Sequence, residues 1–151
     1  MVERRQARSI ALEILYQSEI TGLTLAVAVE RRASTEQSTP EFTLKLLDGI
    51  QENKAMIDIL IERYSENWIL ERLPIVDRNI LRISMYEMVF ESDIPLSVSI
   101  NEAIELAKSF GGTESGRFVN GVLGQAAKNL EDKEKSTLKK NRSSRETRRH
   151  K

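Results

Sequence analysis

Apolar residues recur every three or four positions along most of this chain, which is the spacing that places them on one face of an α-helix. No segment sustains the strict alternation of apolar and polar residues that a half-buried β-strand requires. The pattern therefore predicts an all-α fold. About seven helices are expected, over residues 4–20, 25–32, 40–50, 54–61, 75–91, 100–110 and 113–130.

The segment over residues 75–91 differs from the others because it is apolar on nearly every side. A helix of this kind is usually central and covered by several neighbours. Its few charged residues include Asp77, Arg82 and Glu87, which we expect to mark where the helix reaches the surface and contacts a protein partner.

Two helices joined by a glycine turn are predicted at the end of the apolar pattern. Ser99 and Glu102 have the spacing of a capping box, so a helix is expected to begin near residue 100. Gly111-Gly112 should end it, because glycine adopts the left-handed conformation without steric cost. Thr113 or Ser115 can then cap the last helix. Its apolar stripe comprises Val119, Val122, Leu123, Ala126 and Leu130.

The first helix combines arginines with an aromatic residue. Arg5, Arg8, Leu12 and Tyr16 lie opposite the stripe that begins at Ala7, and Arg4 lies beside them. Guanidinium groups near an aromatic ring suit an RNA backbone and an unstacked base. A solvated basic face with a packed tyrosine is the alternative interpretation.

Two further aromatic residues are assigned from their position in the pattern. Phe118 falls outside the stripe of the last helix, so we expect it to face the gap beside the first helix and to stack on a base near Tyr16. Burial in the core is the alternative. Trp68, which precedes the short segment before Pro74, is expected to be a core residue.

The glycines around the predicted turn do not form a nucleoside-triphosphate loop. Gly111 and Gly116 have the outer spacing of such a loop, but Arg117-Phe118 stands where Lys-Ser/Thr is required, and a helix precedes the segment instead of a strand. Free backbone N–H groups at the start of the last helix, with Arg117 adjacent, could still hold one phosphate of a polymer.

Composition argues against catalysis. The chain has no cysteine and a single histidine, His150, next to its last residue. Disulfides, thiolate zinc sites and histidine-based triads are therefore excluded, and we expect neither enzymatic activity nor a cofactor or metal. No apolar run is long enough to span a membrane, and the absence of cysteine fits the cytoplasm.

Charge is distributed unevenly although the net charge is zero. Residues 131–151 hold nine Lys/Arg and four Asp/Glu, a balance of +5 that leaves −5 for residues 1–130. With one apolar residue, Leu138, this tail is expected to be disordered. It is either a non-specific electrostatic arm for RNA or a solubilising tail.

Several blocks resemble the bacterial NusB family of transcription antitermination factors over about residues 4–130. They are Arg4-Arg5-x-Ala7-Arg8 followed by Leu15-Tyr16, the Leu81-Arg82-Ile83 and Tyr86-Glu87 pairs, the run from Ile100 to Gly111, and Phe118-Val119-Asn120-Gly121-Val122-Leu123. The two blocks near the C-terminus are long enough to be specific.

The resemblance implies two small packed helical bundles that bind single-stranded boxA RNA of nascent ribosomal transcripts together with NusE, a small-subunit ribosomal protein, within the RNA polymerase antitermination complex. It leaves open whether the free protein forms a homodimer. The RNA contacts that it implies are Arg4, Arg5, Arg8, Tyr16, Glu114, Gly116, Arg117 and Phe118.

Two alternatives remain at this point. One is a NusB-like RNA-binding module of the kind fused to ribosomal RNA methyltransferases, although this chain has no glycine-rich cofactor loop. The other is a helical scaffold that binds protein through Asp77, Arg82 and Glu87 and binds no RNA.

Overall fold

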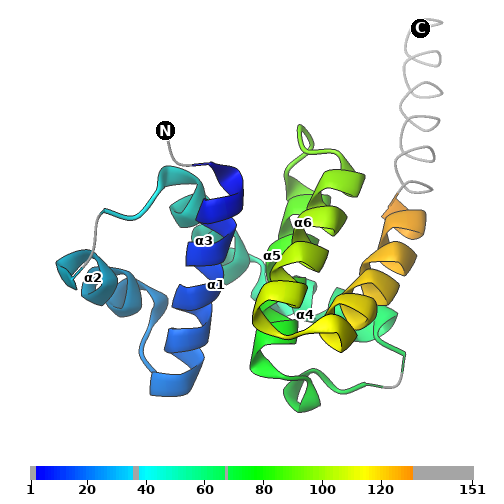
Figure 1. Ribbon diagram of the computed structural model, residues 1–151, viewed down its shortest axis with the longest axis horizontal. Helices are drawn as coiled ribbons and strands as arrows, with labels where there is room; N and C mark the ends of the chain where they lie inside the picture. Colours follow the sequence, from blue (N-terminus) through cyan, green and yellow to red (C-terminus); the bar gives the residue numbers. More distant parts are fainter. Residues whose placement is uncertain (1–2, 36–37, 67, 131–151) are drawn as a thin grey trace, which may run out of the picture.

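The computed structural model describes residues 3–35, 38–66 and 68–130, and this part of the chain is helical without strands (Figure 1). The labelled helices are α1 (Arg4–Thr21), α2 (Leu25–Thr35), α3 (Glu41–Glu52), α4 (Lys54–Tyr64), the short 3₁₀ helix η1 (Leu70–Arg72), α5 (Ile75–Phe90) and α6 (Leu96–Phe110). A last helix occupies residues 113–130. The all-α prediction is confirmed. The predicted tail, residues 131–151, lies outside the described residues.

The helices form two bundles that meet along α1, α3 and α5. Figure 1 shows α1, α2 and α3 on one side, and α4, α5, α6 and the helix of residues 113–130 on the other. Helix α5 packs against α1, α3, α4 and α6. The two-bundle arrangement expected from the family resemblance is therefore present.

Helix α5 occupies the centre, as its apolar sequence predicts. Every residue from 81 to 88 is buried. The backbone of α3 comes so close to α5 that a Cβ atom at Gly49 would overlap the ring of Tyr86. Gly49 therefore allows the two bundles to approach, and any side chain at this position would separate them.

Glycine turns end α1 and α6, and the turn after α6 lies where the sequence predicts. Gly22 follows α1 with φ of 74°, and Gly112 follows α6 with φ of 93°. Both values lie in the left-handed region that glycine adopts at little cost. The turn at Gly112 directs the last helix back along α6 and places residues 113–118 at the same end of the molecule as the end of α1 (Figure 1).

The predicted capping box is wrong. Helix α6 begins at Leu96 after Pro95, one turn before the predicted start, and Ser99 is already inside the helix and buried. Its hydroxyl group donates to Glu87 Oε1 at 3.2 Å. The hydroxyl group of Ser115 donates to the carbonyl oxygen of Gly111 at 3.1 Å, and residue 115 already lies inside the last helix, so it is not the N-cap.

Candidate RNA-binding surface

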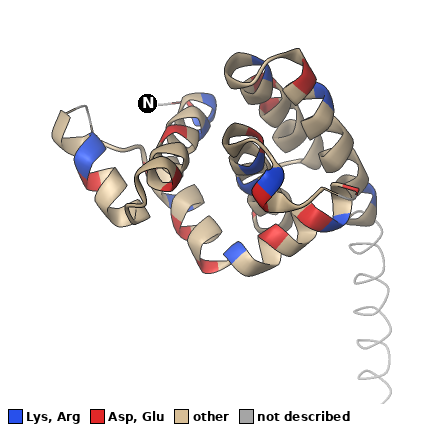
Figure 2. Cartoon of the chain, turned by 90° about the horizontal axis from the view of Figure 1, so that it is seen from below, with Lys and Arg blue, Asp and Glu red and all other residues tan. Residues whose placement is uncertain are grey.

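The start of α1 presents two exposed arginines, each beside a carboxylate from the other bundle. Arg4 Nη2 lies 3.7 Å from an Asp93 carboxylate oxygen, and Arg5 donates two hydrogen bonds of 3.0 Å to Glu102. These bonds hold the pKa of Glu102 below its ordinary value despite partial burial. Figure 2 shows basic and acidic residues mixed along the helices. To bind Arg4 or Arg5, a phosphate must displace the carboxylate that is paired with it.

Arg8 does not lie on this exposed face, so its predicted position is wrong. Its side chain is 4% exposed and donates two 2.7 Å hydrogen bonds to Glu87. Its guanidinium carbon also lies 5.5 Å from the centre of the Phe42 ring. Helix α1 packs against α3 and α5, so both of its sides are covered and Leu12 is buried as well.

The three residues proposed for partner binding, Asp77, Arg82 and Glu87, are also buried, which contradicts the prediction that they mark a surface. Helix α5 has neighbours on too many sides for its charged residues to reach solvent. Arg82 and Glu87 instead face charged partners inside the protein. A scaffold that binds protein through this surface is therefore excluded.

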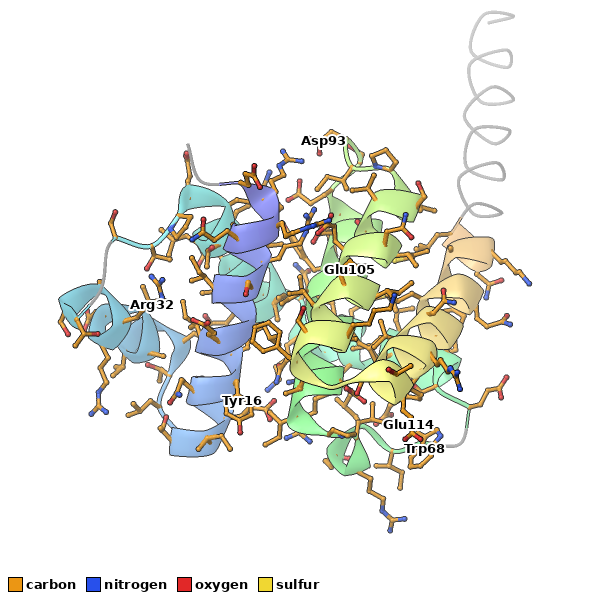
Figure 3. All side chains as sticks on the ribbon, in the orientation of Figure 1. Tyr16, Arg32, Trp68, Asp93, Glu105 and Glu114 are labelled. Carbon is orange, nitrogen blue, oxygen red and sulfur yellow. The ribbon has the colours of Figure 1, made fainter. Side chains whose placement is uncertain are left out.

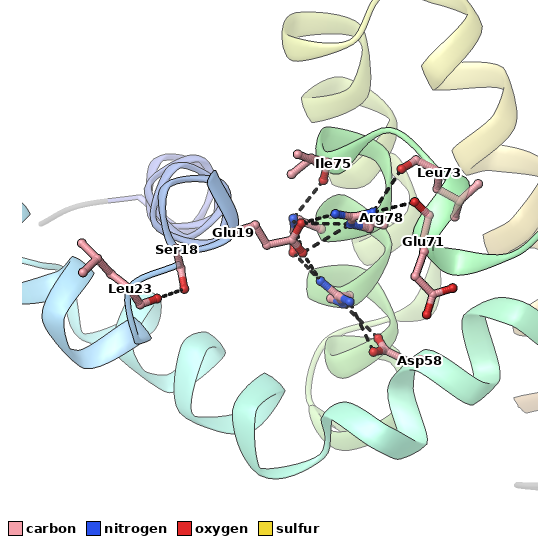
Figure 4. A network of polar contacts seen from close by, with 10 residues as sticks. Ser18, Glu19, Leu23, Asp58, Glu71, Leu73, Ile75 and Arg78 are labelled. Carbon is pink, nitrogen blue, oxygen red and sulfur yellow. Dashed lines mark hydrogen bonds and ion pairs between the residues drawn. The ribbon is translucent and has the colours of Figure 1, made fainter. Parts of the chain in front are cut away.

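Figure 4 shows the polar network around Glu19, Asp58 and Arg78. This network compensates the charge of the buried Arg82. Arg82 donates to Asp58 from α4 at 2.9 Å and to Glu19 from α1, and Arg78 also donates to Glu19. Burial raises the pKa of Glu19, but the hydrogen bonds from the two arginines outweigh burial and lower it overall. The network therefore joins the two bundles and is structural.

Asp77 is buried without such a network. Its Oδ1 atom has no hydrogen-bond partner among the described residues. Burial raises the pKa of Asp77, and the nearby Ser115 hydroxyl group partly opposes this. A carboxylate in this position carries a cost in folding stability at neutral pH, because its negative charge is removed from water.

Tyr16 and the predicted turn residues lie at the opposite end of the molecule from Arg4. Figure 3 shows Tyr16, Glu114 and Trp68 at one end and Asp93, the partner of Arg4, at the other. The rise of a helix is about 1.5 Å per residue, so about 18 Å of α1 separates Arg4 from Tyr16. An RNA that contacts both ends must therefore be several nucleotides long.

The turn residues differ in accessibility. Glu114 and Arg117 are exposed, and Tyr16 is 38% exposed. Gly116 is buried, and a Cβ atom there would lie 3.3 Å from Lys108 Cγ on α6. The glycine thus serves the packing of two helices, and the side chains available to a ligand come from its neighbours.

Phe118 faces Trp68. The two ring centres lie 6.3 Å apart at an interplanar angle of 74°, an edge-to-face contact. Phe118 is half-buried and packs against the core. The structure therefore gives Phe118 an aromatic neighbour from the segment before η1, which the helical pattern did not predict.

Trp68 is the residue that sequence reasoning missed. It was expected in the core, but its side chain is 56% exposed. Ile69 next to it is 47% exposed, whereas Leu70 and Leu73 are buried. The signal available in the sequence is the polar run Ser65-Glu66-Asn67 directly before Trp68, which is typical of a surface connection.

The described residues contain no group of three or more His, Cys, Asp or Glu residues that could hold a metal ion. Within the same part of the chain, no single helix is long and apolar enough to cross a membrane. Helices α1 and α2 meet the length and composition test only as a pair, bent by 117°. The apolar residues of α1 are largely buried in the protein core.

These observations define an all-helical, two-bundle protein with arginines and aromatic rings at its exposed ends. The family model of NusB matches residues 5–128. The transcription antitermination protein NusB of Bacillus thuringiensis (strain Al Hakam) is 50% identical over 123 residues, which cover 81% of this chain and 95% of that protein. The chain belongs to the NusB family.

Solved structures agree with this assignment. The NusB structure from T. maritima matches with a TM-score of 0.76 and 43% identity, covering 84% of this chain and 92% of that chain. A chain from a crystal structure of the antitermination factors NusB and NusE in complex with double-stranded RNA matches with a TM-score of 0.70 and 28% identity, covering 83% and 96%.

Proposed function

We propose that this chain is a transcription antitermination factor that binds the boxA element of nascent ribosomal RNA transcripts together with NusE. Membership of the NusB family and 50% identity to proteins named for antitermination support the role. The related structure with NusE and RNA supports the two partners. The protein acts by binding and has no catalytic step.

The observation that carries this proposal is the placement of arginines near the start of α1 and of aromatic rings with a further arginine toward its other end. Arg4 and Arg5 supply guanidinium groups at one end, and Tyr16, Arg117 and Phe118 lie toward the other. Guanidinium groups bind phosphates, and aromatic rings stack on bases that are not paired. Single-stranded RNA offers both phosphates and unpaired bases to such a surface.

The mechanism is a tether made of several weak contacts. Each RNA contact is weak alone, because Arg4 and Arg5 must exchange a carboxylate for a phosphate. Contacts to NusE hold the same RNA nearby and raise the effective concentration of each remaining contact. The looped transcript therefore stays with the RNA polymerase complex in the cytoplasm while elongation continues.

The specificity of this binding is the first test. Fluorescence anisotropy with labelled RNA at fixed salt compares a boxA sequence with a scrambled sequence of the same composition. We expect tighter binding to boxA, with the difference largest when NusE is present. Equal affinity for both RNAs under both conditions would leave a NusB-like module without boxA specificity, which is the alternative function.

A further inference from the structure

Trp68 and the last helix enclose a groove whose lining includes no residue of α1. Its volume is about 320 Å³, at the lower end of the range of about 300–1,000 Å³ for small-molecule sites. The groove lies between the end of α4, the connection to η1 and the helix of residues 113–130. Its side chains include those of Tyr64, Trp68, Arg117, Phe118 and Gln125, with Gly121 between them.

The walls of the groove are held in place although Trp68 is exposed. The Trp68 amide donates to the Ser65 carbonyl oxygen at 3.4 Å, and the Phe118 ring packs against Trp68. Glu66 has φ of 36°, in the left-handed region that few residues other than glycine adopt. Strained backbone of this kind persists where the surroundings fix it, often at ligand sites.

One wall of the groove is open because it is built from glycine. Gly121 is exposed within the last helix, and a Cβ atom built there meets no atom within 4 Å. Glycine inside a helix costs roughly 0.5–1 kcal/mol relative to alanine. Packing within the protein therefore does not require a glycine at position 121. An occupant of the groove would require it, because a side chain there would fill the groove.

The chemistry of the lining selects the occupant. Aromatic surface makes the groove suitable for a flat apolar group, and Arg117 has no ion-pair partner among the described residues, unlike Arg4 and Arg5. Gln125 offers an amide, and Glu66 at the rim offers a carboxylate that accepts base N–H groups but repels phosphate. A nucleobase inside with its phosphate at Arg117 satisfies all of these features.

We propose that this groove holds one unpaired base of the bound RNA, stacked on Trp68, with the adjoining phosphate at Arg117. This inference deepens the proposed function and rests on it. It assigns the main stacking surface to Trp68 and gives Phe118 the supporting role of holding the indole ring. Base stacking on an aromatic side chain tolerates any base, so the groove adds affinity rather than sequence specificity.

The test uses the full-length chain and a boxA RNA at low salt, with a second series in the presence of NusE. Trp68 is the only tryptophan of the chain, so indole fluorescence in the titration without NusE reports this groove alone. We expect quenching that follows RNA binding measured by anisotropy. Trp68→Leu should lower RNA affinity by about 5- to 150-fold, the range for one stacked base, and Trp68→Phe should restore part of it.

A matched pair of glycine variants separates the groove from general effects on the helix. Gly121→Leu fills the groove, and Gly124→Leu adds the same side chain one turn along the helix, outside the groove lining and also in open space. Both should fold, because neither added Cβ atom meets a neighbour and leucine favours helix. Only Gly121→Leu should weaken RNA binding and abolish the quenching.

The outcomes distinguish this groove from the proposed function. RNA that binds Trp68→Leu and Gly121→Leu with normal affinity, and that leaves the indole fluorescence of the wild-type chain unchanged, overturns the base site, while antitermination through other contacts stands. A blue-shifted indole spectrum on adding NusE without RNA, if NusE is prepared free of tryptophan, would show that the groove binds protein instead. RNA that fails to bind the wild-type chain with or without NusE overturns both proposals.

Discussion

Replacing Arg8 by methionine should destabilise the protein more than it affects RNA binding. The Arg8 and Glu87 side chains are 4% and 1% exposed, and two hydrogen bonds of 2.7 Å join them. Ser99 also donates to Glu87. In Arg8→Met the Glu87 carboxylate stays buried without its cation, and breaking a buried pair in this way costs about 3–5 kcal/mol.

That loss is large relative to the free energy of unfolding of a typical protein, about 5–15 kcal/mol. With a urea dependence of about 1–3 kcal/mol per molar, the unfolding midpoint should fall by roughly 2 M. The assay is urea denaturation at pH 7 and 25 °C followed by far-ultraviolet circular dichroism. Equal slopes for wild type and variant would show that the change is in stability.

The double variant Arg8→Met/Glu87→Met is the control. It removes both charges and leaves apolar side chains of similar length, so much of the lost stability should return. A stable Arg8→Met, or a double variant that loses the sum of the two single losses, would refute the assignment of Arg8 as a structural partner of Glu87. A folded Arg8→Met with a reduced salt dependence of RNA binding would restore Arg8 as an RNA contact.

Three further predictions concern other charged groups. Arg5→Ala should weaken RNA binding and reduce the slope of log affinity against log salt concentration by roughly 0.7 per lost phosphate contact. Glu102→Gln, which removes the carboxylate paired with Arg5, should strengthen RNA binding at low salt. Unchanged affinities and slopes in anisotropy titrations would remove Arg5 from the site. Because the pKa of Asp77 is raised, the stability cost of its negative charge is absent below the unfolded pKa near 3.8 and grows as pH rises through the folded pKa. Asp77→Asn should therefore raise the melting temperature by about 2–4 °C at pH 7 and leave it unchanged at pH 3.5. A decrease at pH 7 would contradict this. Deleting residues 131–151, with their charge of +5, should lower affinity for unrelated RNA at low salt and leave the melting temperature almost unchanged in a thermal scan; a large drop in melting temperature would contradict it.

Helix periodicity predicted most of the fold because each helix carries one continuous apolar stripe. In the last helix Val119, Val122, Leu123 and Ala126 are all buried, as the stripe requires. For α5 the reason differs: it is apolar on nearly every side, and such a helix must be covered by several neighbours. At α6 the helix begins directly after Pro95, so the start predicted from the Ser99 capping pattern was one turn late.

The errors within the candidate site arise from contacts between distant segments. Arg8 and Leu12 look exposed when α1 is considered with one neighbour, but the second bundle covers them, and the partner of Arg8 lies 79 residues away at Glu87. Met56 and Phe110 show the reverse, since both are large apolar residues of helical segments and yet are 42% and 44% exposed. The spacing of apolar residues along one helix does not show which additional face of that helix will be covered by tertiary packing.

Trp68 was misplaced for a different reason. Burial statistics favour a core position for tryptophan, and its neighbours Leu70 and Leu73 are indeed buried. The residue lies in a connection, where neither helical nor strand periodicity assigns a side to each side chain. Its contact with Phe118 on the last helix became evident only from the three-dimensional arrangement.

The coupling between RNA and NusE tests the central claim most directly. The affinity of this chain for boxA RNA is measured by anisotropy at one salt concentration without NusE and with NusE at saturation, and the affinity for NusE is measured with and without the RNA. A shared tether requires each ligand to tighten the other by the same factor, typically about 5- to 150-fold. Affinities for RNA and NusE that are independent of each other would contradict the account.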